Sequence, residues 1–201
     1  MISTFDQIDF TKLKKINVIG TTGAGKSTLS KKLAVLLGQP FIEIDQIFWG
    51  PNWKKPTNRD FYDNLKSFLD NNPTFVLDGN YTKATALKWA YTETVIWVNL
   101  PFAQTLWQLI GRTLKRLLLQ KELWPNTGNR ESIYGHLFTN DSIFYWLFKT
   151  FKGNQIKFKS DMVLKQWAHI QFIELTSNAQ VQQFLQLVTK EIAARNKFIN
   201  N

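Results

Sequence analysis

The most informative absence in this 201-residue sequence is cysteine, which does not occur at all. Disulfide bonds and cysteine–zinc centres are therefore excluded, although the absence hardly separates one cellular compartment from another. Histidine is scarce too, because His136 and His169 are the only two in the sequence and neither has a partner at metal-ligand spacing. We expect both histidines to be structural.

Long apolar runs, internal repeats and low-complexity linkers are also missing. A helix that spans a bilayer needs roughly 20 apolar residues, and no run approaches this length. The opening residues include an acid, Asp6, and no basic residue, so we expect no export signal and a cytoplasmic protein. Apolar residues make up 44% of the chain, enough to bury a core. We expect one compact α/β domain over residues 1–201.

Acidic residues are few: the chain has 15, against 25 lysines and arginines, which leaves a net charge of +10. Residues 101–170 contribute +6 of this total, from ten basic and four acidic side chains. Such a charge favours a polyanionic ligand, either nucleic acid or the phosphates of a nucleotide. A solvated basic surface is the alternative, and charge alone does not decide between them.

The strongest positive feature is a glycine-rich segment near the N-terminus that fits the pattern G-x-x-x-x-G-K-[ST] of the phosphate-binding P-loop. It follows a strand-like run at 16–19 and precedes apolar residues at helical spacing. Backbone N–H groups and the positive end of the helix dipole would then surround a phosphate. An ordinary tight turn is the alternative. The expected nucleotide-binding residues are Gly20, Thr21, Thr22, Gly23, Ala24, Gly25, Lys26, Ser27 and Thr28.

Two residues are expected to bind Mg²⁺ beside the phosphates of ATP, where Lys26 would reach the β- and γ-phosphates. The hydroxyl of Ser27 is one magnesium ligand. Asp78 is the other, because it ends a buried-strand pattern in the form of a Walker-B element, and a carboxylate there would hold the ion directly or through water. The alternative for Asp78 is a turn former in the sequence Asp78-Gly79-Asn80.

The order of predicted elements indicates a three-layer P-loop NTPase fold, with a five-stranded parallel sheet between helices. Two intervals are longer than a crossover requires, and segments that follow the carboxyl ends of parallel strands lie over the ligand crevice. We call residues 46–72 the acceptor insert and residues 102–169 the lid region. The expected strands lie at 16–20, 40–44, 74–78, 94–99 and 170–175. The helices expected besides that of the P-loop lie near 57–71, with Thr57 or Asn58 as the cap, and at 102–121, 141–151 and 179–194.

Another carboxylate follows the strand expected at 40–44. Asp45 falls just past its last residue, facing the crevice, where it would bind hydroxyl groups of an acceptor or act as the base that assists one. A helix cap is the alternative for Asp45. Glu43 would point to the same side of an extended chain, and we expect it to be exposed at the surface.

With these segments in hand, the chain from Ile16 to about Phe151 resembles the adenylate-kinase-related P-loop proteins known as DNA-topology-modulation kinases, of the FlaR type. The resemblance implies a nucleoside-monophosphate-kinase-like fold and ATP binding, and its tryptophan-rich and Asp-Gly-Asn-Tyr segments are specific to this group. The segments that carry it, besides the P-loop, are 44–53, 77–81, 128–132 and 141–143.

True adenylate kinases differ from this chain at one informative point. They carry Asp-Gly-Phe-Pro-Arg where this chain has Asp78-Gly79-Asn80-Tyr81, so an arginine near the transferred phosphate is missing, which argues against AMP as the acceptor. Glu43 and Asp45 are instead similar to the Asp-x-Asp of shikimate-type kinases, in which carboxylates grip a hydroxylated small molecule. Four aromatic residues would form a wall beside a ring-shaped acceptor, namely Phe48, Trp49, Trp53 and Tyr81. Packing in the core is the alternative for them. The expected acceptor-binding residues are Asp45, Trp49, Asp78, Gly79, Asn80, Tyr81 and Arg130.

The lid region supplies the expected cationic groups of catalysis. Arg112 and Arg116 are four residues apart on an amphipathic helix and share a face, and Arg130 lies in a polar turn. Guanidinium groups neutralise the charge that spreads over a γ-phosphoryl group in transfer. Arg112 also resembles the lid-entry arginine that contacts adenine or phosphates in related kinases. A basic solvent face is the alternative for these arginines, and Asn129 is expected to fold the lid.

These features favour a Mg²⁺-dependent kinase that transfers the γ-phosphate of ATP to a nucleoside monophosphate or a hydroxylated metabolite, with Lys26, Asp45, Arg112 and Arg116 as its catalytic residues. One alternative is a nucleotide-regulated protein that binds nucleic acid through the basic stretch 112–165. A slow ATPase with a degenerate acceptor pocket is the other.

Overall fold

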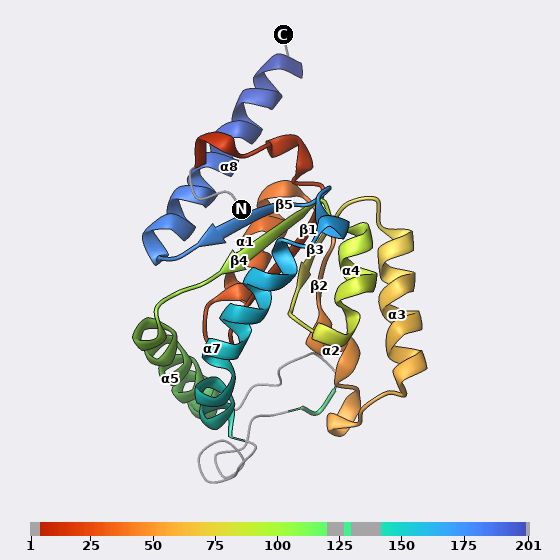
Figure 1. The fold of residues 1–201 in the computed structure, drawn as a ribbon, viewed down its shortest axis with the longest axis vertical. Helices are drawn as coiled ribbons and strands as arrows, with labels where there is room; N and C mark the ends of the chain where they lie inside the picture. The colour runs from red at the N-terminus through yellow and green to blue at the C-terminus, as the bar shows by residue number, and fades with distance from the viewer. Residues whose placement is uncertain (1–4, 120–126, 130–141, 200–201) are drawn as a thin grey trace.

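The computed structural model describes residues 5–119, 127–129 and 142–199. Their centre is a five-stranded parallel sheet with the strand order β2-β3-β1-β4-β5 (Figure 1). The strands are β1 (Lys15–Gly20), β2 (Phe41–Glu43), β3 (Phe75–Asp78), β4 (Thr94–Val98) and β5 (Gln171–Leu175). The five strands predicted from the sequence are confirmed, because each observed end lies within one residue of the expected one.

Helices cover both faces of this sheet. α1 and α8 pack on one face and α4 and α7 on the other, so that in Figure 1 α7 crosses in front of the sheet with α1 behind it. The helices are α1 (Lys26–Leu37), α2 (Ile44–Phe48), α3 (Asn58–Asn71), α4 (Thr85–Tyr91), α5 (Phe102–Leu119), α7 (Ile143–Met162) and α8 (Asn178–Ile199). Short 3-10 helices are η1 (Phe5–Gln7), η2 (Phe10–Lys12), η3 (Pro51–Trp53), η4 (Thr82–Ala84) and η5 (Lys165–Trp167).

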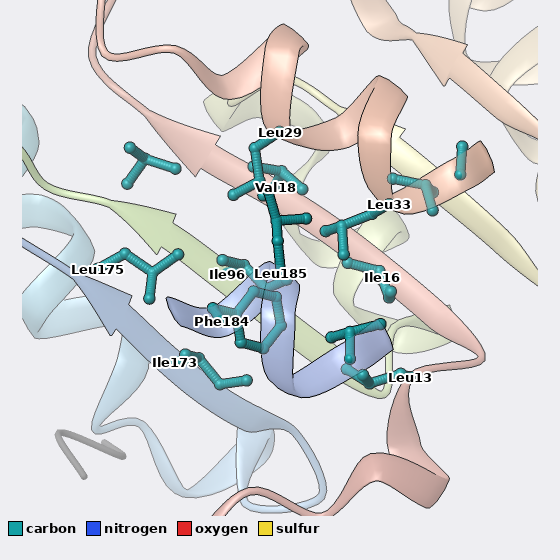
Figure 2. Close-up of a cluster of buried hydrophobic side chains, with 14 of the residues drawn as sticks. Leu13, Ile16, Val18, Leu29, Leu33, Ile96, Ile173, Leu175, Phe184 and Leu185 are labelled. Atoms are coloured by element: carbon teal, nitrogen blue, oxygen red, sulfur yellow. The ribbon is translucent and has the colours of Figure 1, made fainter. Parts of the chain in front are cut away.

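The central strands are buried on both sides, as a parallel sheet between helices requires. On β1, Ile16 and Val18 pack among side chains of α1 and α8, including Leu33 and Phe184 (Figure 2). Ile19 belongs to a second cluster, formed with α4 and α7 on the opposite face. The alternation follows from the twofold repeat of an extended chain. The core therefore holds β1, and with it the start of the P-loop, rigidly in place.

Two of the predicted helices show how local signals and packing combine. α3 begins after Thr57, whose hydroxyl accepts a hydrogen bond from the backbone N–H of Asp60 at 3.1 Å, so the predicted cap is confirmed. α7 is longer than the segment near 141–151 that the sequence predicts, and it continues past Gly153. Phe158 on the additional turns packs against Trp97 of β4 with ring centroids 5.8 Å apart. Burial of that ring outweighs the low helix propensity of glycine.

A buried polar network lies under the ends of β1 and β3. Asn17 of β1 donates from Nδ2 to the carbonyls of Leu77, at 3.1 Å, and Gly79, at 3.2 Å, and its Oδ1 accepts from the indole of Trp89 at 3.2 Å. Lys88 of α4 is 1% exposed and donates from Nζ to the carbonyl of Gly79 at 3.1 Å and to that of Asn80. Burial lowers the pKa of Lys88 from 10.5 to about 7, an effect that attraction to Asp78 opposes.

We predict a pH-dependent stability that arises from Lys88. Between about pH 7 and pH 10 the unfolded chain holds a proton that the folded chain has released, so the free energy of unfolding should rise with pH, by up to about 1.4 kcal/mol per pH unit. Urea unfolding at several pH values measures this slope. The slope should shrink in Lys88→Met, because the side chain no longer titrates. An unchanged slope in that variant would contradict the prediction.

Candidate functional site

The predicted P-loop forms the turn between β1 and α1, and two of its glycines are required by their neighbours. At Gly20 (φ +150°), a Cβ atom would lie 2.5 Å from the carbonyl oxygen of Val98 on β4. At Gly23 (φ +81°), a Cβ atom would lie 2.8 Å from the carbonyl oxygen of Thr105 on α5. A Cβ atom cannot be accommodated at either position, because β4 and α5 pack closely against the backbone of the loop. The loop is therefore a packed structural unit and more than a glycine-rich turn.

Asn80 holds the first residue of this loop from the side. Its Oδ1 accepts from the N–H of Gly20 at 2.9 Å, and its Nδ2 donates to the carbonyl of Gly20 at 2.7 Å. We expected Asn80 to contact the acceptor. Its amide instead pairs with both backbone groups of a loop residue, so we assign Asn80 to positioning the loop.

A cavity of about 610 Å³ opens beside the loop, between α1, α5 and α8. Its volume lies in the range that small-molecule ligands occupy. The cavity includes most of the residues predicted to bind ATP, and it brings both Arg112 and Arg116 to the same space as the P-loop. The predicted residues that line it are Gly23, Ala24, Gly25, Lys26, Ser27, Thr28, Arg112 and Arg116. Gly20, Thr21 and Thr22 lie outside its lining and form the support of the loop.

Lys26 is half-buried and lines the cavity. Its Nζ donates to the carbonyl of Thr21 at 3.1 Å. Burial lowers the pKa of Lys26, while attraction to Asp78 and Asp45 opposes that effect and the charge of Arg112 adds to it. An anionic phosphate at this point would favour the charged ammonium, as the prediction for Lys26 requires.

Asp78 and Ser27 meet as the sequence predicts. The hydroxyl of Ser27 donates to Oδ2 of Asp78 at 2.5 Å. The other carboxylate oxygen of Asp78, Oδ1, is buried and has no hydrogen-bond partner. Burial raises the pKa of Asp78, whereas Lys26 and the hydrogen bond from Ser27 lower it. The turn-former alternative for Asp78 does not account for a buried carboxylate paired with a P-loop hydroxyl.

These oxygens fit a magnesium ion. A buried carboxylate oxygen without a partner and an adjacent hydroxyl are hard ligands of the kind that Mg²⁺ prefers. In residues 5–119, 127–129 and 142–199, no group of three or more histidine, cysteine, aspartate or glutamate side chains could hold a metal. An ion here would thus depend on phosphate oxygens and water for its other ligands, which is the usual arrangement for Mg²⁺ beside a nucleotide.

Asp45 is also within electrostatic reach of Lys26, but it belongs to a helix and does not directly follow the strand as predicted. The strand ends at Glu43, and Asp45 is in the first turn of α2, where Ile44 is fully buried. Asp45 is open to solvent, yet its crowded surroundings raise the pKa of the carboxylate, and the charges of Lys26, Arg112 and Arg116 oppose this. The carboxylate is therefore within electrostatic reach of all three expected catalytic cations.

The expectation for Glu43 is wrong. Its side chain is only 16% exposed and forms an ion pair with Lys31 of α1 at 2.6 Å. The physical reason is the position of β2 in the sheet, which pairs Glu43 with Asp78 of β3 and points its carboxylate toward α1. Because the chain turns into α2 at Ile44, Glu43 and Asp45 do not alternate along one extended strand.

Aromatic side chains of the acceptor insert gather next to Asp45. The ring of Phe48 lies 4.7 Å from that of Tyr81 and 4.9 Å from that of Trp49. Lys55 lies over the ring of Trp49, 5.0 Å from its centroid. Burial and the nearby Asp45 both raise the pKa of Tyr81, so the Tyr81 hydroxyl remains protonated. Phe48 and Tyr81 are both half-buried and pack against the core, in line with the core-packing alternative, and Trp49 is half-buried next to Phe48.

The side chain of Asn129 and a backbone hydrogen bond from Asn52 to Thr127, at 2.9 Å, join the described part of the lid region to the acceptor insert. Asn129, which is fully buried, accepts from the N–H of Trp53 at 2.7 Å and donates to the carbonyl of Gly50 at 3.0 Å. This supports the expectation that Asn129 folds the lid. Arg130 and His136 lie outside the described residues. The ring of His169 contacts the carbonyl of Trp89 at 3.2 Å, as a structural histidine would.

Sequence reasoning did not single out several residues of the cavity. Lys31 and Lys32 follow the P-loop by one helical turn, and Gln108 precedes Arg112 by one turn, so helical spacing was a usable signal for them. The turn Leu175-Thr176-Ser177-Asn178 after the last strand is expected beside the adenine through its backbone, and Asn178 does line the cavity. Only the fold brings its side chain to Gln108, whose Nε2 donates to it at 3.2 Å. The cavity residues that the sequence did not single out include Lys31, Lys32, Gln108, Val181 and Gln182.

No helix among the described residues is long and apolar enough to cross a membrane. No protein-family model matches the chain. No curated protein sequence matches it either.

Solved structures do resemble the chain. The shikimate kinase from Acinetobacter baumannii, solved in complex with shikimate, is 18% identical and matches 92% of this chain and 96% of its own, at a TM-score of 0.53. The shikimate kinase from Bacteroides thetaiotaomicron is 15% identical over 89% of this chain and 97% of its own, at a TM-score of 0.50. A gluconokinase from Sinorhizobium meliloti 1021 is 12% identical over 94% of this chain and 99% of its own, at a TM-score of 0.46. The first two likenesses show that the chain has the α/β fold found in P-loop kinases.

Proposed function

We propose that this protein is a Mg²⁺-dependent kinase that transfers the γ-phosphate of ATP to a small-molecule acceptor. The observation that carries the proposal is the arrangement around Lys26. Lys26 lies within electrostatic reach of both Asp78, which accepts a hydrogen bond from Ser27, and Asp45. Arg112 and Arg116 line the same cavity as Lys26. A phosphoryl-transfer site needs these parts and no covalent nucleophile, because positioning and electrostatics supply most of its catalysis.

The chain's own residues have distinct tasks in this proposal. The N–H groups of the P-loop and Lys26 hold the phosphates, and Ser27 and Asp78 would hold the magnesium ion, which screens the phosphate charge. The acceptor oxygen attacks the γ-phosphorus as the bond from that phosphorus to ADP breaks, and its proton passes to Asp45. The raised pKa of Asp45 suits a base better than an ordinary carboxylate would. Arg112 and Arg116 stabilise the charge that develops on the transferred group.

The acceptor side favours a hydroxylated molecule over a nucleoside monophosphate. Asp45 is an acceptor of hydrogen bonds from hydroxyl groups, and its negative charge repels a phosphate. Trp49 and Tyr81 offer an aromatic wall beside it, and Lys55 over Trp49 places a cation near a negatively charged substituent. The Acinetobacter neighbour, which holds shikimate, supports a small hydroxylated acid as the acceptor class.

Lys26→Ala should weaken ATP binding by about 10- to 100-fold, because a charge-assisted contact to phosphate in an enclosed site is lost. Isothermal titration calorimetry with magnesium-bound ATP measures the affinity. Lys115→Ala is the matched control, since Lys115 is exposed on α5 and does not line the cavity. Equal affinity in wild type and Lys26→Ala would contradict the phosphate assignment.

Asp78→Asn keeps the shape of the side chain and removes its charge. We expect the magnesium concentration needed for half-maximal turnover to rise by about tenfold or more, because a carboxylate is lost from the ion's surroundings. Turnover measured against magnesium concentration at saturating ATP provides the test. Asp70→Asn, at an exposed ion pair on α3, should leave the curve in place. If both variants behave alike, Asp78 is not the magnesium residue.

Asp45→Asn should lower kcat by about 10²- to 10⁴-fold with little change in ATP affinity, since it removes the base and leaves the P-loop intact. A coupled assay of ADP release across hydroxy acids, sugars and nucleoside monophosphates first identifies the acceptor. Gln46→Ala, at an exposed position of α2, serves as the control. The kinase proposal fails if no acceptor raises turnover above ATP hydrolysis alone.

A further inference from the structure

Lys88 is a buried amine that the proposed chemistry leaves without a role. It is 1% exposed, although lysine is almost never fully buried unless its ammonium has partners. Its partners are two backbone carbonyls, those of Gly79 and Asn80, and the Gly79 contact measures 3.1 Å. Burial of a lysine side chain costs free energy that two hydrogen bonds to carbonyls only partly offset. The role of Lys88 therefore depends on where those two carbonyls lie.

The two carbonyls belong to the turn that leaves β3. Asp78 precedes this turn, and its carboxylate receives the hydroxyl of Ser27. Asn80 is part of the turn, and its side-chain amide pairs with both backbone groups of Gly20. Asp78 at the end of β3 and Asn80 in the turn therefore each contact the P-loop, and Lys88 binds the backbone carbonyls of Gly79 and Asn80 beside them.

The backbone of this turn does not hold its shape unaided. Gly79 has a φ of +132° and Tyr81 a φ of +29°, a conformation that a tyrosine rarely adopts. Inward-pointing carbonyls in such a turn need donors. Asn17 supplies one to Gly79 at 3.2 Å, and Lys88 supplies one to Gly79 and one to Asn80. Lys88 is the side chain that binds both carbonyls.

We propose that Lys88 is a positioning residue of the phosphate site. It fixes the turn at Gly79 and Asn80. The Asn80 amide can then hold Gly20, so that the P-loop keeps its phosphate-binding shape. The effect is indirect, because α4 lies on the face of the sheet opposite to α1. This inference rests on the proposed function only in that the P-loop binds a nucleotide, and it does not depend on phosphate transfer or on the acceptor.

Lys88→Met tests it, because methionine fills similar space without a donor. We expect the affinity for magnesium-bound ATP, measured by calorimetry on the full chain, to fall by about tenfold or more. Thr92→Val is the matched control, since the Thr92 hydroxyl is equally buried and donates to the backbone carbonyl of Lys88 at 2.9 Å, away from the turn. Both variants should lower the unfolding temperature, and only Lys88→Met should lower ATP affinity. Equal affinities for wild type and Lys88→Met would overturn the inference.

A double-mutant cycle separates positioning from a merely structural role. If Lys88 acts through Asn80, Asn80→Ala alone should weaken ATP binding about as much as Asn80→Ala combined with Lys88→Met. Fully additive losses would overturn the inference. Lys88→Gln keeps an N–H donor and replaces Lys88→Met in the cycle if Lys88→Met does not fold. Tested alone, Lys88→Gln should bind ATP with an affinity between those of wild type and Lys88→Met. Wild-type protein that binds no ATP would overturn the proposed function and this inference together, whereas ATP binding without transfer would overturn the kinase proposal alone.

Discussion

The site depends on the parallel pairing of β1 with β3. In this register Val18 lies beside Asp78, and the N–H of Gly79 donates to the carbonyl of Val18 at 3.1 Å. The carboxyl end of β3 therefore arrives where β1 turns into the P-loop. From this single adjacency follow the contact of Asp78 with Ser27 and the contact of Asn80 with Gly20. Without it, the loop would lose both its carboxylate and its lateral support.

Electrostatic balance is the second constraint on the site. Lys26 lies within the field of Asp78 and Asp45. Its attraction to each carboxylate moves the pKa values of all three groups toward the charged form, whereas repulsion by Asp45 raises the pKa of Asp78. With Arg112 and Arg116 included, three cations face two carboxylates. Magnesium-bound ATP is a net anion, so this excess of positive charge would favour its binding.

The sequence was sufficient for the features that local pattern controls. Short strand-like runs between helical patterns located the strands to within one residue, and the spacing of the P-loop identified Lys26 and Ser27. It was insufficient where the environment is set by a distant segment. Glu43 reads as a surface residue until β2 is placed next to α1, and Asn80 reads as a ligand residue until Gly20 is placed beside it. Lys88 carried no signal at all, because a lysine in a short helix is ordinarily solvated.

The close approach of Gly20 to Val98 has a consequence for how the molecule recognises its ligand. The loop is preorganised by β4 on one side and by Asn80 on the other, so little conformational entropy is lost when a phosphate arrives. The backbone of Gly20 thus takes part both in packing against the sheet and in the loop that is proposed to bind the anion. A substitution at this corner would consequently disturb folding as well as the proposed anion site, and the loop could not be transplanted into another scaffold without its two neighbours.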